Sequence, residues 1–169
     1  MILIFTSLSL FLLSGIASVV SIFTGKKQWG PPIGAWGAAC AAFVGCIPAV
    51  QVLAGRPIAP FMHHWPIFMG SFCIKLDMLS AFFLLVILMV TAFTSVYGLG
   101  YSAGSGKAGF KKMAWFFFNM LGASMALVCV AGNAVLFLLA WETMALSSFF
   151  LVAFDYEKAV VRKAAWIYM

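Results

Sequence analysis

A chain of 169 residues that is 65% hydrophobic and only 8% charged is not a water-soluble domain, because such a domain needs a charged shell of roughly a quarter of its residues. Its mean hydropathy of +1.11 and its long uncharged runs match a bilayer core about 30 Å thick. The net charge of +6 would favour nucleic-acid binding in a soluble protein, but here the basic residues lie between apolar runs. We therefore expect an integral membrane protein that contacts the lipid bilayer and no nucleic acid.

The first two apolar runs each predict a helix that crosses the membrane. The first, residues 2–24, lacks the basic segment that opens a signal peptide and is long enough to span, and it ends before Lys26 and Lys27. The second, residues 33–55, is rich in Gly and Ala, which let a neighbouring helix approach closely. We interpret it as a packed helix rather than a lipid-facing one.

Residues 56–77 form an interfacial loop with three prolines, and its final alternation predicts a strand or hairpin. His63 and His64 are adjacent in this loop, a spacing that prepares neither a haem nor a zinc site. The loop ends at Asp77, which we interpret as the N-cap of the next helix. A functional role for Asp77 would need a partner, and Lys75 is the nearest candidate.

Three further runs follow, at residues 78–100, 113–131 and 134–154, with a break at Gly132 and Asn133 between the last two. In the fourth run, Trp115 and the three phenylalanines after it suit an interfacial belt in contact with lipid. Residues 155–163 read as a charged connector, and residues 164–169 as the start of a sixth helix. The predicted fold class is an all-α integral membrane protein with five transmembrane helices, the start of a sixth, and a β-hairpin between helices two and three.

The basic residues predict the orientation, since Lys and Arg beside short loops stay on the cytoplasmic face. Only Arg56 and Lys75 lie on one side, and the other side holds Lys26, Lys27, Lys107, Lys111, Lys112, Lys158, Arg162 and Lys163. The N-terminus should therefore face outward. In a Gram-negative bacterium this places a multi-pass protein in the inner membrane, with the loop of residues 56–77 in the periplasm.

Glu142 is a single acid inside the fifth run, about 12 Å along a helix from Ala134 and about 18 Å from Phe154. An ionised carboxylate at that depth costs about 2.5–3.5 kcal/mol, so such residues face protein, a partner or a water path. Two interpretations remain. Glu142 is a proton or ion site, or it stays protonated and hydrogen-bonds a group such as Asn119, Ser124 or a backbone carbonyl.

Two segments resemble a known family. The stretch "WETMALSSFFLVAFDYEKAVVRKAAWIYM" contains Trp141, Glu142, Ser147 and Ser148, and "LDMLSAFFLLVILMVTAFTSVYGLGY" precedes it. Both resemble the antiporter-like proton-pumping subunits shared by respiratory complex I, cation/proton antiporters and membrane-bound hydrogenases, and most of all the hydrogenase-4 component B branch. The resemblance covers residues 76–169, and residues 1–75 match only in topology.

The resemblance implies a function. The matching glutamate pairs with a lysine on a later helix, which assigns proton translocation to Glu142, with Trp141, Ser147 and Ser148 beside it as candidate supporting residues. Lys75 and Asp77 are further candidate supporting residues from the sequence itself. It implies no cofactor, and the partners are other membrane subunits of a hydrogenase or complex I-like assembly. We expect residues 1–132 to form the N-terminal helices and residues 133–169 to begin the proton-translocating domain.

The sequence ends before the family's partner lysine and broken helices, so a truncated or split subunit of a proton-translocating oxidoreductase complex is expected. Such a chain has no active site of its own. The alternative is a small structural membrane protein without transport activity. The DNA after the codon for Met169 separates the two, because only the first requires a continuation that encodes a membrane-embedded lysine.

Overall fold

The computed structural model describes residues 1–24, 29–64, 71–103 and 108–168, and it confirms the expected fold class. Lys26, Lys27 and Lys107 lie outside these residues. The elements are α1 (Ile2–Phe23), α2 (Gly30–Leu53), β1 (Phe61–His64), β2 (Ser71–Ile74), α3 (Met78–Ala103), α4 (Ala108–Val130), α5 (Ala134–Val152), the 3₁₀ turn η1 (Ala153–Asp155) and α6 (Ala159–Tyr168). Five helices, α1 to α5, are long and apolar enough to cross a membrane.

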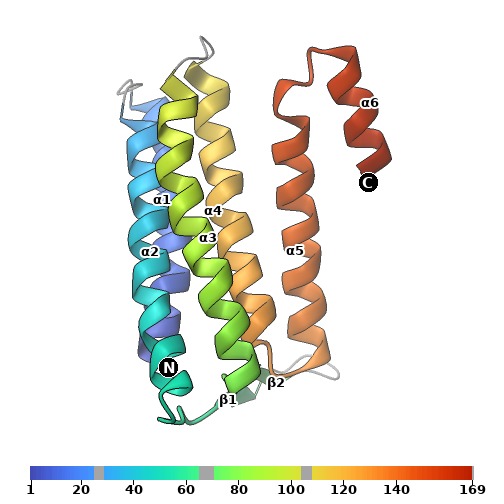
Figure 1. The fold of residues 1–169 in the computed structure, drawn as a ribbon. Helices are drawn as coiled ribbons and strands as arrows, with labels where there is room; N and C mark the ends of the chain where they lie inside the picture. The colour runs from blue at the N-terminus through green and yellow to red at the C-terminus, as the bar shows by residue number, and fades with distance from the viewer. Residues whose placement is uncertain (25–28, 65–70, 104–107, 169) are drawn as a thin grey trace.

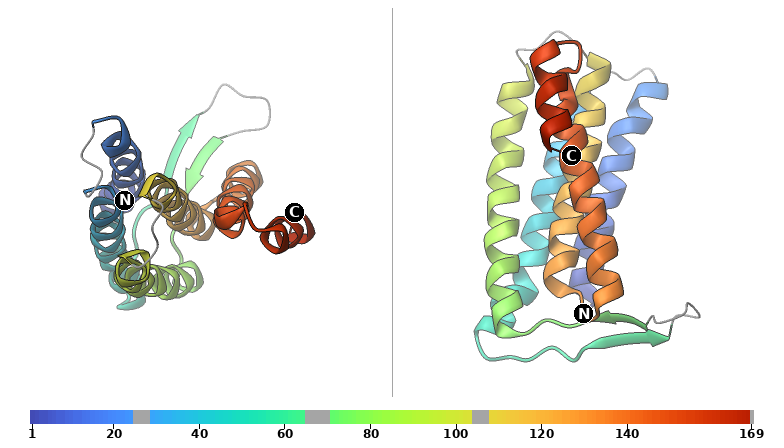
Figure 2. Two further views of the ribbon diagram at one scale, coloured as in Figure 1. Left: turned by 90° about the horizontal axis from the view of Figure 1, so that it is seen from above. Right: turned by 90° about the vertical axis from the view of Figure 1, so that its right-hand side faces the viewer.

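The spanning helices run side by side, and α1 to α4 form a bundle (Figure 1). The fifth, α5, packs mainly against α4, and α6 lies beyond α5 on the far side from the bundle. Viewed along the helices, α5 and α6 extend outward from α4 (Figure 2). Much of the surface of α5 is therefore uncovered in this chain.

Several element boundaries differ from the sequence prediction. Pro31 and Pro32 occupy the first turn of α2, where a missing N–H costs nothing, so that helix begins before residue 33. The helix α4 also begins earlier than predicted, at Ala108 rather than at residue 113. The helix α6 begins at Ala159, so part of the predicted charged connector is helical. Charged residues at a membrane surface continue a helix readily, which apolar run lengths alone do not detect.

Close packing of small residues joins α1, α2 and their neighbours, as the Gly- and Ala-rich second run predicted. A Cβ at Gly37 would overlap the side chain of Ser14, and a Cβ at Gly34 would lie 2.8 Å from the Cβ of Trp115. At Gly45 it would meet Leu88 at 2.7 Å. Glycine lets these backbones approach to distances that any side chain would prevent.

Asn119 is fully buried and connects three helices through its side chain. Its Oδ1 accepts a hydrogen bond from Ser14 Oγ of α1 at 2.7 Å. Its Nδ2 donates to the carbonyl oxygens of Gly34 in α2 (3.0 Å) and of Trp115 in its own helix (2.8 Å). Both polar atoms of the amide are thus satisfied inside an apolar bundle, as burial requires.

The predicted hairpin is present, with β1 and β2 antiparallel and Phe61 opposite Ile74. The end of β2 also pairs with the short link between α4 and α5, through a bridge between Ile74 and Ala131. The amide N–H of Lys75 donates to the carbonyl of Val130 at 2.9 Å, and that of Gly132 donates to Cys73 at 2.7 Å. The hairpin is therefore attached by backbone hydrogen bonds to the segment from which α5 starts (Figure 1).

Candidate functional site

Glu142 lies near the middle of α5, about 12 Å from Ala134 and about 15 Å from Val152 along the axis. The helix starts cleanly, because Asn133 Oδ1 accepts a hydrogen bond from the N–H of Leu136 at 2.8 Å. This N-cap and the preceding Gly132 confirm the predicted break between the fourth and fifth runs. The acid therefore lies near the middle of a helix that is long and apolar enough to cross a membrane.

Glu142 faces away from the bundle. The buried residues of α5 are Leu136, Ala140 and Ser147, which form the stripe that packs toward α4. At about 100° per residue, Glu142 is turned about 200° from Ala140. It is exposed in this chain, between Leu138 (59% exposed) and Leu146 (42% exposed) one turn away on either side. The carboxylate thus emerges from an apolar surface.

Among the described residues, none donates a hydrogen bond to Glu142 or pairs with its charge. The two side chains that the sequence offered as partners are engaged elsewhere. Asn119 uses both polar atoms within α1, α2 and α4, and the Ser124 hydroxyl donates to the carbonyl of Leu121 at 2.9 Å. Neither Asn119 nor Ser124 therefore forms a hydrogen bond with Glu142 in this structure.

The residues of α5 that the sequence analysis expected to support Glu142 lie on different faces of the helix. Ser147 is buried toward α4 and donates to the carbonyl of Thr143 at 2.7 Å. Ser148 accepts a hydrogen bond from the hydroxyl of Tyr168 in α6 at 2.8 Å. Trp141 is half exposed and meets Phe137 edge-on, with ring centroids 5.5 Å apart. The sequence did not indicate the role of Tyr168, because contact between two helices is not encoded in local spacing.

Asp77 and Lys75 lie at the hairpin end of the bundle, beside the start of α3. Asp77 Oδ1 accepts a hydrogen bond from the N–H of Ser80 at 2.7 Å, which confirms the predicted N-cap. Hydrogen bonds from Ser80, first from its backbone N–H, hold the pKa of the Asp77 carboxyl below its ordinary value, and the Lys75 charge acts in the same direction. The side chain of Lys75 is exposed.

Within the part of the chain that the structure describes, no three His, Cys, Asp or Glu side chains gather closely enough to hold a metal ion. His63 is exposed on β1, and the four cysteines are free thiols. The chemistry of the described residues therefore centres on one intramembrane carboxyl group.

Comparison with known proteins connects this architecture to respiratory and hydrogenase complexes. No family model matches the chain. NADH-quinone oxidoreductase subunit L of Mycobacterium tuberculosis (strain ATCC 25618 / H37Rv) is 30% identical over 157 residues, which cover 88% of this chain and 24% of that protein. Hydrogenase-4 component B of Escherichia coli (strain K12) is 35% identical over 96 residues, which cover 57% of this chain and 14% of that protein.

The chain is homologous to part of these antiporter-like membrane subunits. It is a multi-pass membrane protein that spans about a quarter or less of the length of the curated relatives it matches. The match to subunit L covers 88% of this chain, so it reaches well into residues 1–75, where the sequence motifs gave only a likeness in topology. Those residues lack a short motif, because small residues that pack helices tolerate exchange among themselves.

Proposed function

We propose that Glu142 of this antiporter-like chain is the proton-binding carboxylate of a proton path in a hydrogenase or complex I-like membrane assembly. The observation that carries the proposal is the placement of an acid at mid-span, on the face of α5 opposite its own bundle. A carboxylate that faced lipid would gain nothing for its cost of about 2.5–3.5 kcal/mol. Its surface is therefore built to meet protein or water.

The chemistry follows from the two protonation states of the side chain. Protonated Glu142 is neutral and suits an apolar surface, whereas the ionised form needs a cation or water close by. A cationic side chain on a neighbouring helix, or water admitted beside it, would shift the balance between these states. Movement of that cation then loads or releases a proton at the glutamate. We propose that residues 133–169 begin this proton-translocating part and that residues 1–132 support it.

The exposed surface of α5 around Glu142 fits the proposal that other membrane segments cover it. Large apolar side chains are exposed on this helix: Leu138, Leu139, Trp141, Leu146 and Phe150. A helix surface that faces lipid would also expose large apolar side chains, but it would not contain an acid such as Glu142. We propose the inner membrane as the location, with the N-terminus and the hairpin outside. The described cations Lys158, Arg162 and Lys163 lie at the opposite end of α5 from the hairpin, which agrees with that orientation.

The test replaces Glu142 in the assembled complex. Glu142→Gln retains the size and hydrogen-bonding groups of the side chain but cannot bind and release a proton. Glu157→Gln is the matched control, since Glu157 lies outside the spanning helices in the turn before α6. Proton uptake by inverted vesicles that hold the complete complex is measured for both variants, alongside a blot for assembly.

The proposal expects Glu142→Gln to assemble normally and to lose proton uptake, while Glu157→Gln retains it. Wild-type uptake by the Glu142→Gln variant would contradict the proton path. That result would favour a packing role, because the neutral acid and the amide make similar contacts in a dry site. Loss of assembly in Glu142→Gln alone would assign the residue to subunit contact rather than to proton transfer.

A further inference from the structure

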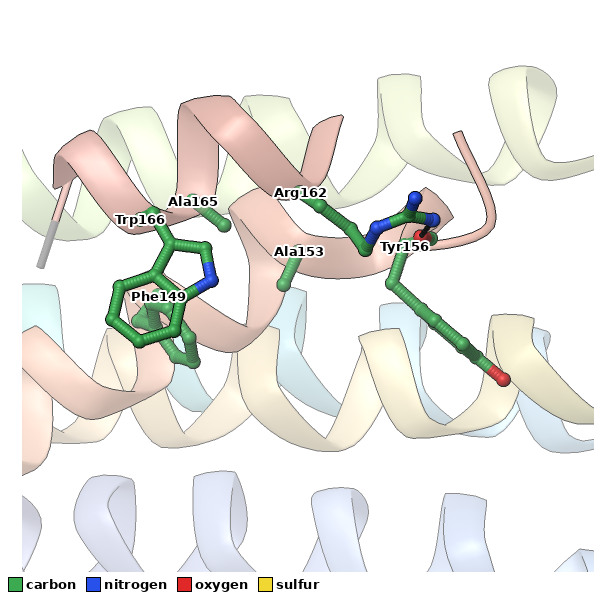
Figure 3. Close-up of a pocket in the computed structure, with 6 residues that line it drawn as sticks. All are labelled: Phe149, Ala153, Tyr156, Arg162, Ala165 and Trp166. Atoms are coloured by element: carbon green, nitrogen blue, oxygen red, sulfur yellow. Dashed lines mark hydrogen bonds between the residues drawn. The ribbon is translucent and has the colours of Figure 1, made fainter. Parts of the chain in front are cut away.

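A pocket of about 240 Å³ lies between α5 and α6, at the end of the bundle opposite the hairpin. Its lining residues are Phe149, Ala153, Tyr156, Arg162, Ala165 and Trp166. Figure 3 shows Phe149 and Trp166 at one end of the pocket and Tyr156 and Arg162 at the other. The pocket therefore has an apolar end within the span and a cationic end near the membrane surface.

Two contacts hold α6 against α5 and so shape the pocket. Ala165 is buried, and its small side chain lets α6 approach. Further along, the Tyr168 hydroxyl donates to Ser148 Oγ at 2.8 Å. At the surface end, Arg162 Nη1 donates to the carbonyl oxygens of Tyr156 and Glu157, both at 3.0 Å. The guanidinium is thus fixed at the mouth of the pocket.

Arg162 has N–H donors at the mouth beyond those used in its two observed hydrogen bonds. A guanidinium has five N–H donors, and the two hydrogen bonds found for Arg162 both come from Nη1. The neighbouring Lys163 is exposed, and among the residues that the structure places no acceptor is found for its ammonium group. Arg162 Nε and Nη2 can therefore donate to an anion outside the chain, and Lys163, the next residue of α6 and outside the pocket lining, adds an exposed positive charge nearby.

Along α6, the cations Arg162 and Lys163 come first and Trp166 follows, an order that is typical of a contact with lipid at the membrane interface. Trp166 follows Arg162 by four residues, so it lies on the same face of α6 and about 6 Å further along the helix. Trp166 is 82% exposed, so a molecule in the bilayer can reach its ring. Cations at the headgroup level with an indole just below them are typical of membrane-interface anchors.

We propose that this pocket binds an anionic phospholipid, with an acyl chain beside Phe149 and Trp166 and the phosphate at Arg162 and Lys163. The volume equals about eight water molecules at about 30 Å³ each, but an apolar lining does not hold water. A hydrocarbon chain fits that lining, and the charged mouth selects an anionic headgroup over a zwitterionic one. Basic pockets between spanning helices on the cytoplasmic side bind such headgroups in other membrane proteins.

Quenching of Trp166 fluorescence tests the proposal. The full chain is reconstituted in vesicles of phosphatidylcholine and phosphatidylglycerol, with bromine on the acyl chains of either lipid. The Trp166 signal is the difference between the unmodified chain and Trp166→Phe. We expect brominated phosphatidylglycerol to quench this signal more strongly than brominated phosphatidylcholine at equal mole fraction.

Lys163→Gln is the diagnostic variant, because no observed hydrogen bond depends on Lys163. Its removal lowers the relative affinity for phosphatidylglycerol about fivefold, the factor expected for one basic residue near a membrane surface. Lys75→Gln removes the same charge at the other end of the bundle and leaves the preference unchanged. Excess inorganic phosphate leaves the quenching unchanged as well, because a free ion lacks the acyl chain.

Equal quenching of Trp166 by the two brominated lipids would overturn the proposal, as would an unchanged preference in Lys163→Gln. A Trp166 signal insensitive to both lipids would show that protein covers the pocket, which also contradicts it. Release of quenching by inorganic phosphate would reduce the site to an anion site without lipid. Each result is read in the folded chain, since the side chain of Lys163 is exposed and its replacement by Gln opens no cavity.

Discussion

Replacement of Asn119 by leucine tests whether a polar side chain fixes the arrangement of α1, α2 and α4. Leucine has the same branched arrangement of heavy atoms as asparagine but cannot make the hydrogen bonds to Ser14 and Gly34. Each former partner of Asn119 retains another hydrogen-bonding group. The Ser14 hydroxyl also lies 3.0 Å from the carbonyl oxygen of Phe11, and the Gly34 carbonyl lies within the helical hydrogen-bond pattern of α2. The change therefore removes two contacts between helices and leaves few stranded groups.

The expected loss follows from those two contacts. Hydrogen bonds between membrane helices contribute about 0.6 kcal/mol on average and at most about 1.7 kcal/mol each. Asn119→Leu should therefore lower the free energy of unfolding by about 1 kcal/mol, and by no more than about 3 kcal/mol. Ser14→Ala removes only one contact, so it should cost about half as much. The two changes share one hydrogen bond, so their effects should not add.

Equilibrium unfolding in mixtures of sodium dodecyl sulfate and dodecylmaltoside, followed by circular dichroism, measures these differences. Ser124→Ala is the control, since Ser124 is buried in the same helix but bonds only to its own backbone. It should change stability little. An Asn119→Leu variant as stable as the unmodified chain, or strictly additive effects with Ser14→Ala, would refute the argument.

Three further outcomes are expected. Gly37→Ala should destabilise the chain by about 1–3 kcal/mol through overpacking against α1, whereas Gly100→Ala, which meets nothing within 4 Å, should be neutral in the same unfolding assay. The depressed pKa of Asp77 means that its stabilising effect is complete above the ordinary pKa of about 3.9 and is lost as the pH falls through the lower folded value. Asp77→Asn should remove that acid-dependent loss, and an unchanged pH profile would contradict the assignment. Single cysteines at Met62 and Glu157, in a background without the native cysteines, should react with an impermeant thiol reagent from opposite sides of the membrane; labelling from one side would refute the orientation.

The number and order of the helices followed from the sequence because run length and composition report on the bilayer directly. Five runs of sufficient length became five spanning helices, and the alternation before Asp77 became a hairpin. Asp77 and Asn133 cap their helices as their chemistry predicts, through hydrogen bonds within three residues. Features that depend on depth or on local hydrogen bonds were therefore predictable.

The rotation of each helix about its axis was not predictable, because it depends on the whole bundle. The belt prediction was wrong for Trp115, which is only 6% exposed and packs over Gly34 and Gly98. The glycines of two other helices leave the space that its ring fills. Ser147 and Ser148 are adjacent in sequence yet contact different helices. The direction of Glu142 likewise depended on which stripe of α5 packs against α4.

The attachment of β2 to the link before α5 has a mechanical consequence for the acid. The bridge between Ile74 and Ala131 and the bond from Gly132 to Cys73 anchor the link that leads into α5 to the hairpin. A Cβ at Gly132 would collide with Cys73, so the anchor also admits no larger residue there. Each residue inserted between this anchor and Glu142 would shift Glu142 by about 1.5 Å along the helix axis and rotate it by about 100° about that axis. The attachment to the hairpin thus fixes both the position of Glu142 along the bundle and the direction in which its side chain points.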